Sequence, residues 1–137
     1  MRLALDWGKA RIGVAACDAA EVLAYPVETV QAGPGANARI AELVAEYEPG
    51  EVVVGLPVAL DGAEREAAGY VRERVEELRP LLGRVPVRFV DERLTTATAA
   101  RRLHQVGRSA KRQRGVIDQA AAVAILEQAL AMLDPKE

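Results

Sequence analysis

The sequence predicts an α/β fold with one mixed β-sheet and helices on its faces. Residues 2–30 contain three strand-like segments joined by short connections, which is typical of an antiparallel meander. After a Gly-Pro-Gly break at 33–35, apolar residues at helical spacing alternate with short apolar strands. The chain has 137 residues, half of them apolar, so we expect one domain over residues 1–137 with one core.

Each element follows from local patterning. Five strands are expected, at residues 2–6, 12–17, 22–30, 51–56 and 86–91. Four helices are expected, at 40–47, 71–82, 95–106 and 117–133. Thr95 or Thr96 is a suitable N-cap for the third helix, and a polar loop at 107–115 precedes the last. The predicted order is βββαβαβαα, and Gly13 inside the second strand indicates close approach of another backbone.

Composition excludes several function classes. No apolar run approaches the roughly 18 residues of a membrane helix, and Met1 leads directly into a strand without a visible signal peptide. We therefore expect a cytoplasmic protein with no membrane partner. The single Cys17 cannot form an internal disulfide, and no Cys/His cluster could bind zinc. Cys17 is expected to be a small buried residue.

The charges are unevenly distributed along the chain. The net charge is −2, yet no Asp or Glu stands between Arg93 and Ile117. Seven cationic residues occupy that stretch: Arg93, Arg101, Arg102, Arg108, Lys111, Arg112 and Arg114. A basic segment on an acidic protein indicates contact with a polyanion. A solvated helix face and loop explains the same pattern equally well, so charge alone leaves both interpretations open.

Three carboxylates interrupt patterns that otherwise build a core. Asp6 ends an apolar strand, and the pair Asp91 and Glu92 ends another. Asp118 lies in the first turn of the predicted last helix, on its apolar stripe. That stripe comprises Ala121, Ala122, Ile125, Ala129 and Met132. An uncompensated carboxylate there costs several kcal/mol, so an Arg, a cap interaction or a metal must balance its charge.

Each acid also has a structural explanation. Asp6 could cap its own turn, Asp91 or Glu92 could pair with a neighbouring Arg, and Asp118 could favour the positive end of its helix dipole. Together they suggest a metal site. If the first and fifth strands are parallel neighbours, their carboxyl ends share one sheet edge, and a helix could bring Asp118 there. Carboxylates suit Mg²⁺ or Mn²⁺, and two such ions can catalyse phosphodiester hydrolysis.

Further candidate residues would contact substrate. Arg11 could hold a phosphate bidentately or pair with Asp6 or Asp18 to fix the hairpin. Trp7 could stack on a base, although core packing is favoured. The expected phosphate contacts are Lys9, Arg11, Arg93, Arg108, Lys111, Arg112 and Arg114. The last four would form a basic loop beside Asp118 and give salt-dependent affinity.

Four blocks resemble one family. They are Leu5-Asp6-Trp7-Gly8 with Arg11-Ile12-Gly13-Val14-Ala15, then Val54-Gly55-Leu56-Pro57 with Asp61-Gly62, Val90–Thr96, and Ile117–Leu126. In order and spacing they are similar to the YqgF family, also called RuvX, and they span nearly the whole chain.

The resemblance implies a ribonuclease H-like fold, a five-stranded sheet in the order 3-2-1-4-5 and a Mg²⁺-dependent phosphodiesterase. It assigns the metal-binding acids to Asp6, Glu92 and Asp118. Strand alternation alone allows either Asp91 or Glu92, and the resemblance favours Glu92. Two departures from the family pattern affect substrate contacts. After Gly8 the family often has Thr or Ser and then Lys, whereas this chain has Lys9 and Ala10. After Pro57 the family often has Asn, whereas this chain has Val58-Ala59.

Several functions remain open. The resemblance implies maturation of the 5′ end of precursor 16S rRNA, with resolution of branched DNA junctions as an alternative. A nucleic-acid-binding factor for ribosome assembly, without catalysis, is a third possibility. A nucleotide-using enzyme of the actin and sugar-kinase type would need two such domains, so a homodimer would be required. The sequence leaves open monomer or homodimer, RNA or DNA, and endo- or exonucleolytic cutting.

Overall fold

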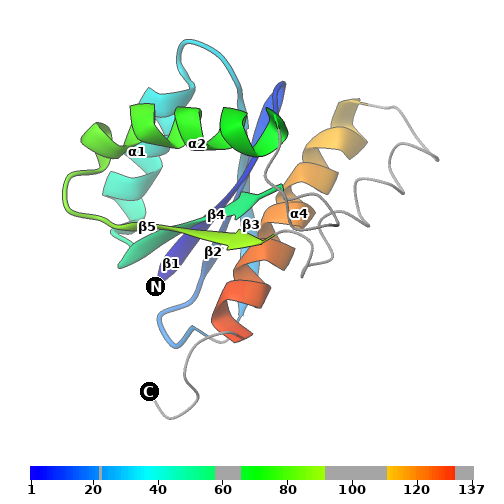
Figure 1. The fold of residues 1–137 in the computed structure, drawn as a ribbon. Helices are drawn as coiled ribbons and strands as arrows, with labels where there is room; N and C mark the ends of the chain where they lie inside the picture. Colours follow the sequence, from blue (N-terminus) through cyan, green and yellow to red (C-terminus); the bar gives the residue numbers. More distant parts are fainter. Residues whose placement is uncertain (22, 58–65, 92–110, 132–137) are drawn as a thin grey trace.

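A five-stranded mixed sheet forms the centre of the computed structural model (Figure 1), which describes residues 1–21, 23–57, 66–91 and 111–131, the last range without the side chains of 111–117. The strands are β1 (Arg2–Trp7), β2 (Arg11–Cys17), β3 (Ala24–Gln31), β4 (Glu51–Leu56) and β5 (Val87–Asp91). Their spatial order is β3-β2-β1-β4-β5, as the family resemblance implied. The first three strands pair antiparallel, and β4 is parallel to both β1 and β5.

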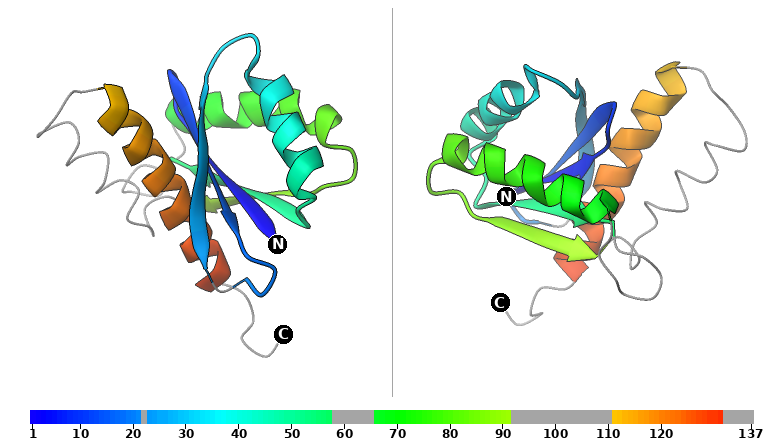
Figure 2. Two further views of the ribbon diagram at one scale, coloured as in Figure 1. Left: turned by 180° about the vertical axis from the view of Figure 1, so that it is seen from behind. Right: turned by 45° about the horizontal axis from the view of Figure 1, so that its top comes forward.

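Helices cover both faces of this sheet (Figure 2). The helices α1 (Ala36–Tyr47) and α2 (Glu66–Leu78), with the short 3₁₀ helix η1 (Arg79–Leu82), lie on one face. The long helix α4 (Lys111–Ala131) crosses the other face and contacts mainly β1, β2 and β3. None of the helices in the described part of the chain has the length and apolar composition needed to cross a bilayer.

The sheet divides the core into two clusters through the alternation of its side chains. On β1, Leu3, Leu5 and Trp7 pack with α1 and α2, whereas Ala4 packs with α4. The α1/α2 side holds large aliphatic residues, and the α4 side holds many alanines. Trp7 is only 6% exposed, which confirms its predicted core position, and Cys17 is buried as expected. Small side chains on the second face let α4 lie close to the strands.

The prediction for the start of the last helix was wrong. The helix begins at Lys111 and not at Ile117, so residues 111–115 are helical and not part of a loop. Lys, Arg and Gln are good helix formers, and they outweigh a cost of about 1 kcal/mol for Gly115 inside the helix. The segment lacks apolar periodicity, so the periodic pattern could not reveal it. The helix predicted at 95–106 lies outside the described residues.

A charged ladder links the amino ends of the three parallel strands. Glu51 of β4 accepts hydrogen bonds from Arg2 Nε at 2.6 Å and from Arg88 Nη2 at 2.9 Å. Burial raises the pKa of Glu51, but the bonds from Arg88 and Arg2 outweigh it and hold the pKa below its ordinary value. Glu51 therefore stabilises β4 between its neighbours at neutral pH.

We expect Glu51→Gln to lower the free energy of unfolding by roughly 1 kcal/mol at pH 7, because two arginines lose their shared anion. The wild-type carboxyl has a lowered pKa in the folded state. Its contribution is therefore present above 4.5, the ordinary value, and is lost as the pH falls through the folded pKa. Urea unfolding of both proteins at several pH values measures the difference. Glu42→Gln, which removes an exposed ion pair on α1, is the matched control. An equal effect at pH 7 and pH 3 would contradict the ladder.

Candidate functional site

Asp6 lies near the carboxyl end of β1 and is the one buried charged side chain among the residues described, at 2% exposure. Alternation along β1 places Asp6 on the side of Ala4, which packs against α4. The carboxylate therefore lies on the α4 face, at the edge where the three parallel strands end. This position agrees with the predicted sheet-edge location of the first acid.

Gly13 brings the second acid to the same place. It is paired with Asp6 across β1 and β2. A Cβ atom at Gly13 would lie 2.0 Å from the backbone oxygen of Asp118 and 3.1 Å from the nitrogen of Gln119. The α4 backbone therefore rests directly on this glycine, as the Gly in the strand predicted. The register of two strands and one helix contact thus places Asp118 beside Asp6.

Asp118 is the eighth residue of α4, counted from Lys111. The prediction that it lies in the first turn was wrong, and so the helix dipole does not explain it, because that effect fades within the first turn. The stripe on which it stands is buried as predicted: Ala121, Ala122, Ile125 and Ala129. The predicted stripe residue Met132 lies outside the described residues.

Arg11 compensates the charge of Asp118. Its Nε donates to Asp118 Oδ2 at 2.7 Å, and both side chains are only partly exposed, at 27% and 16%. Asp6 and Asp18 were the partners expected for Arg11, and this pair, which joins residues 107 positions apart, was not predicted. Beside it, the Gln119 amide donates to Thr29 Oγ1 at 3.0 Å and ties α4 to β3.

The third candidate acid follows β5 in the sequence. β4 lies between the first and fifth strands, in the order 3-2-1-4-5 that the resemblance implied. Because all three strands are parallel, their carboxyl ends share one edge of the sheet. Val90 packs on the α4 side and Phe89 on the other, so alternation places Asp91 with Phe89, away from Asp6. Glu92 lies outside the described residues. Within the described ranges no three potential metal ligands form a cluster.

The predicted cationic residues are placed differently from one another. Lys9 is exposed in the β1–β2 turn, with its Nζ 5.9 Å from the centre of the Tyr70 ring on α2, on the opposite side of the sheet from Asp6. Lys111, Arg112 and Arg114 belong to the first turns of α4, on the helix that carries Asp118. Their side chains, and residues Arg93 and Arg108, lie outside what the structure describes.

Residues 1–132 match the RuvX family, which is described as Holliday junction resolvase. The chain belongs to the RuvX family. A relative from Cutibacterium acnes is 62% identical over 95% of this chain and 81% of its own length. One from Streptomyces coelicolor is 57% identical over 94% of this chain and 78% of its own. Both are named "Putative pre-16S rRNA nuclease".

Solved structures support the fold of this RuvX chain. Thermus thermophilus RuvC superposes with a TM-score of 0.55 at 20% identity, covering 93% of each chain. The RuvC of the same organism in complex with a Holliday junction substrate gives a TM-score of 0.53 at 21% identity, over 94% of this chain and 93% of that one. The ribonuclease H-like fold predicted from the family resemblance is therefore confirmed.

We expect Gly13→Ala to destabilise the RuvX chain by about 1–3 kcal/mol, because the added methyl group meets the α4 backbone and the helix must move. Thermal unfolding measures the loss. Gly69→Ala is the matched control, since a Cβ at Gly69 of α2 meets nothing within 4 Å and the change gains helix propensity. A Gly13→Ala protein as stable as the wild type would refute the close contact.

Proposed function

We propose that this RuvX chain is a metal-dependent nuclease that hydrolyses phosphodiester bonds in nucleic acid. The observation that carries the proposal is the close contact between the α4 backbone and Gly13. This contact brings Asp118 beside the buried Asp6 at the carboxyl edge of the sheet. The Asp6 carboxylate is 2% exposed, so it lies in a site from which most water is excluded. The names of the relatives and the family description support nuclease chemistry.

Asp6 and Asp118 fit a divalent ion, because carboxylate oxygens are the ligands that Mg²⁺ and Mn²⁺ prefer. We propose Glu92 as the third ligand. The placement of Asp91 on the opposite side of the sheet removes the other acid of the pair from the site and so supports this choice. Two ions bound there would activate water and stabilise the leaving oxygen.

The protein's own contribution is rigid positioning. Asp6 is fixed by β1, which pairs on both sides with β2 and β4. Asp118 is fixed by its backbone contact with Gly13 and by Arg11 Nε. The Nε of Arg11 bonds to Asp118, and the two terminal nitrogens of its guanidinium are the donors that we propose for a phosphate oxygen. Arg11 would then orient an acid and hold substrate at once.

The proposed substrate is precursor 16S rRNA, processed at its 5′ end. Relatives with 62% and 57% identity carry the name of a pre-16S rRNA nuclease. Branched DNA is the second candidate, because the family description names Holliday junction resolvase. We infer that the basic segment, including Lys111, Arg112 and Arg114 at the start of α4, contacts the phosphate backbone beside Asp118.

We expect Asp6→Asn and Asp118→Asn to slow Mg²⁺- or Mn²⁺-dependent cleavage of labelled precursor rRNA about a hundredfold or more, because each removes a charged metal ligand. Glu92→Gln should do the same. Asp91→Asn is the matched control and should cleave at the wild-type rate, since alternation places this residue on the other face of the sheet. Full activity of Asp6→Asn would refute the metal site, and a parallel DNA-junction substrate decides between the two candidates.

We expect Arg112→Ala with Arg114→Ala to weaken RNA binding and to reduce the slope of affinity against salt concentration, because fewer counterions are released. Fluorescence anisotropy at several salt concentrations measures the slope. The control pair Arg79→Ala with Arg84→Ala removes the same charge near η1, on the α1/α2 side. If both pairs change the slope equally, α4 has no special place in the interface.

A further inference from the structure

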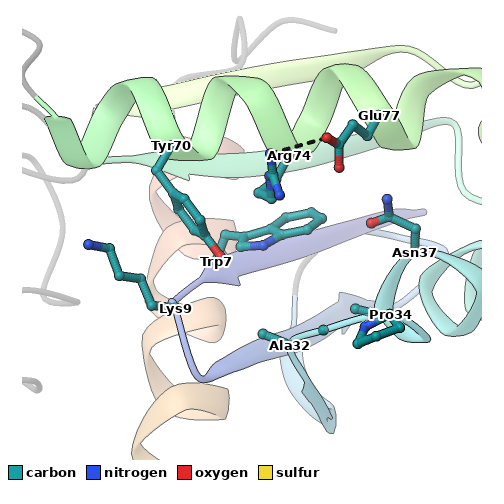
Figure 3. A pocket seen from close by; sticks show the side chains of 10 residues that line it. Trp7, Lys9, Ala32, Pro34, Asn37, Tyr70, Arg74 and Glu77 are labelled. Carbon is teal, nitrogen blue, oxygen red and sulfur yellow. Dashed lines mark ion pairs between the residues drawn. The ribbon is translucent and has the colours of Figure 1, made fainter.

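A second concave site lies across the sheet from the acids. A cleft of about 420 Å³ opens between the β1–β2 turn, the start of α1 and the middle of α2 (Figure 3). Trp7, Lys9, Asn37, Tyr70 and Arg74 are among the residues that line it. Its volume falls in the range of small-molecule sites, about 300–1,000 Å³. We propose that this cleft binds one unpaired nucleobase of the strand that the acids cleave, an inference that rests on the proposed nuclease function.

The cleft and the acids share one end of β1. Asp6 and Trp7 are consecutive, so their side chains point to opposite faces of the sheet at the same edge. Lys9 stands in the turn that follows and also lines the cleft. A nucleic-acid strand that crosses the sheet edge at this turn can therefore reach Asp6 with a phosphate and the cleft with a neighbouring base.

The lining suits a flat, polar-edged group. The Tyr70 ring and the Arg74 side chain project from α2 and supply the accessible flat surfaces, and the nearly buried indole of Trp7, 6% exposed, lies beneath them (Figure 3). Arg74 Nη2 is held by Glu77 at 3.1 Å, and its guanidinium carbon lies 5.4 Å from the centre of the Tyr70 ring. Nucleobases stack on aromatic rings and on guanidinium planes of this kind.

Polar groups at the rim add recognition to stacking. The side-chain amide of Asn37, from the first turn of α1, supplies both a donor and an acceptor to a base edge. The exposed ammonium of Lys9 supplies a cation for the adjoining phosphate. A smaller cavity of about 200 Å³ shares Trp7, Lys9 and Tyr70 with the cleft and is also lined by Pro57.

The occupant is an unpaired base because a paired one cannot enter. In a duplex both faces of a base are stacked and its pairing edge is occupied, so a concave site reaches it only after it is extruded. The cleft therefore favours a single-stranded segment beside the cleavage point. This property distinguishes a single-stranded end of precursor RNA from the fully paired arms of a DNA junction.

Trp7 makes the proposal directly measurable, because it is the only tryptophan in the chain. The full chain is titrated in EDTA with a short single-stranded RNA, the same backbone without bases, and a duplex of equal length. The expected result is a change in Trp7 emission with the single strand and about tenfold weaker binding of the other two. Equal affinity for the abasic backbone, or unchanged emission at saturation, would overturn the cleft.

Two variants locate the effect within the cleft. Asn37→Ala and Tyr70→Ala should each weaken single-strand binding several-fold, while Tyr70→Phe, which keeps the ring, should bind nearly as well. Gln31→Ala removes an exposed amide from β3 outside the cleft and should leave binding unchanged. Circular dichroism verifies that each variant is folded.

Failure of this proposal is distinguishable from failure of the nuclease proposal. Binding is measured without metal, so base-dependent Trp7 emission with no cleavage in Mg²⁺ or Mn²⁺ refutes the nuclease and keeps the base site. Metal-dependent cleavage of single-stranded RNA that is unaffected by Asn37→Ala and Tyr70→Ala refutes the base site and keeps the nuclease.

Discussion

The contact between Gly13 and the backbone of Asp118 is the constraint on which the rest of the site depends. A side chain at residue 13 would overlap the helix, with its Cβ only 2.0 Å from the Asp118 oxygen. The same close approach explains why the α4 side of the core contains many alanines, including Ala4, Ala15 and Ala122. Larger residues there would lift the helix from the sheet and carry Asp118 away from Asp6. Packing and chemistry are therefore set by the same small residues.

The two faces of the sheet carry different tasks at one edge. The alternation of β1 sends Asp6 toward α4 and Trp7 toward α1 and α2. On one face, Asp6 of β1 lies beside Asp118 of α4, and the close packing of α4 on the strands sets the distance between the helix and the sheet. The other face, built from larger side chains, leaves a cleft beside the turn that contains Lys9. Because Asp6 and Trp7 are consecutive in β1, this one strand sets the distance between the proposed metal site and the proposed base site.

The sequence predicted periodic features well and non-local ones poorly. All five strands and the two helices before β5 could be recognised, because the spacing of apolar residues is local information. The buried stripe of α4 and the close approach at Gly13 followed from local patterns as well. The start of α4 was missed because charged helix formers carry no apolar period. No residue pattern placed β4 between β1 and β5, and that order came only from the family resemblance.

The pairing of Arg11 with Asp118 could not be predicted, since 107 positions separate the two residues and Asp6 and Asp18 lie much nearer to Arg11 in the sequence. It also bears on the choice of ion in the proposed site. Arg11 donates to Oδ2 of Asp118 and so uses one of the roughly four lone-pair sites of that carboxylate, which hinders the binding of one cation through both oxygens. Ca²⁺ takes six to eight oxygens and commonly binds a carboxylate through both, whereas Mg²⁺ needs only one or two singly bound carboxylates and keeps several waters. In the proposed site, the arginine that pairs with the partly exposed helix acid would therefore favour a singly bound Mg²⁺, and the waters that Mg²⁺ keeps would supply the one that phosphodiester hydrolysis needs.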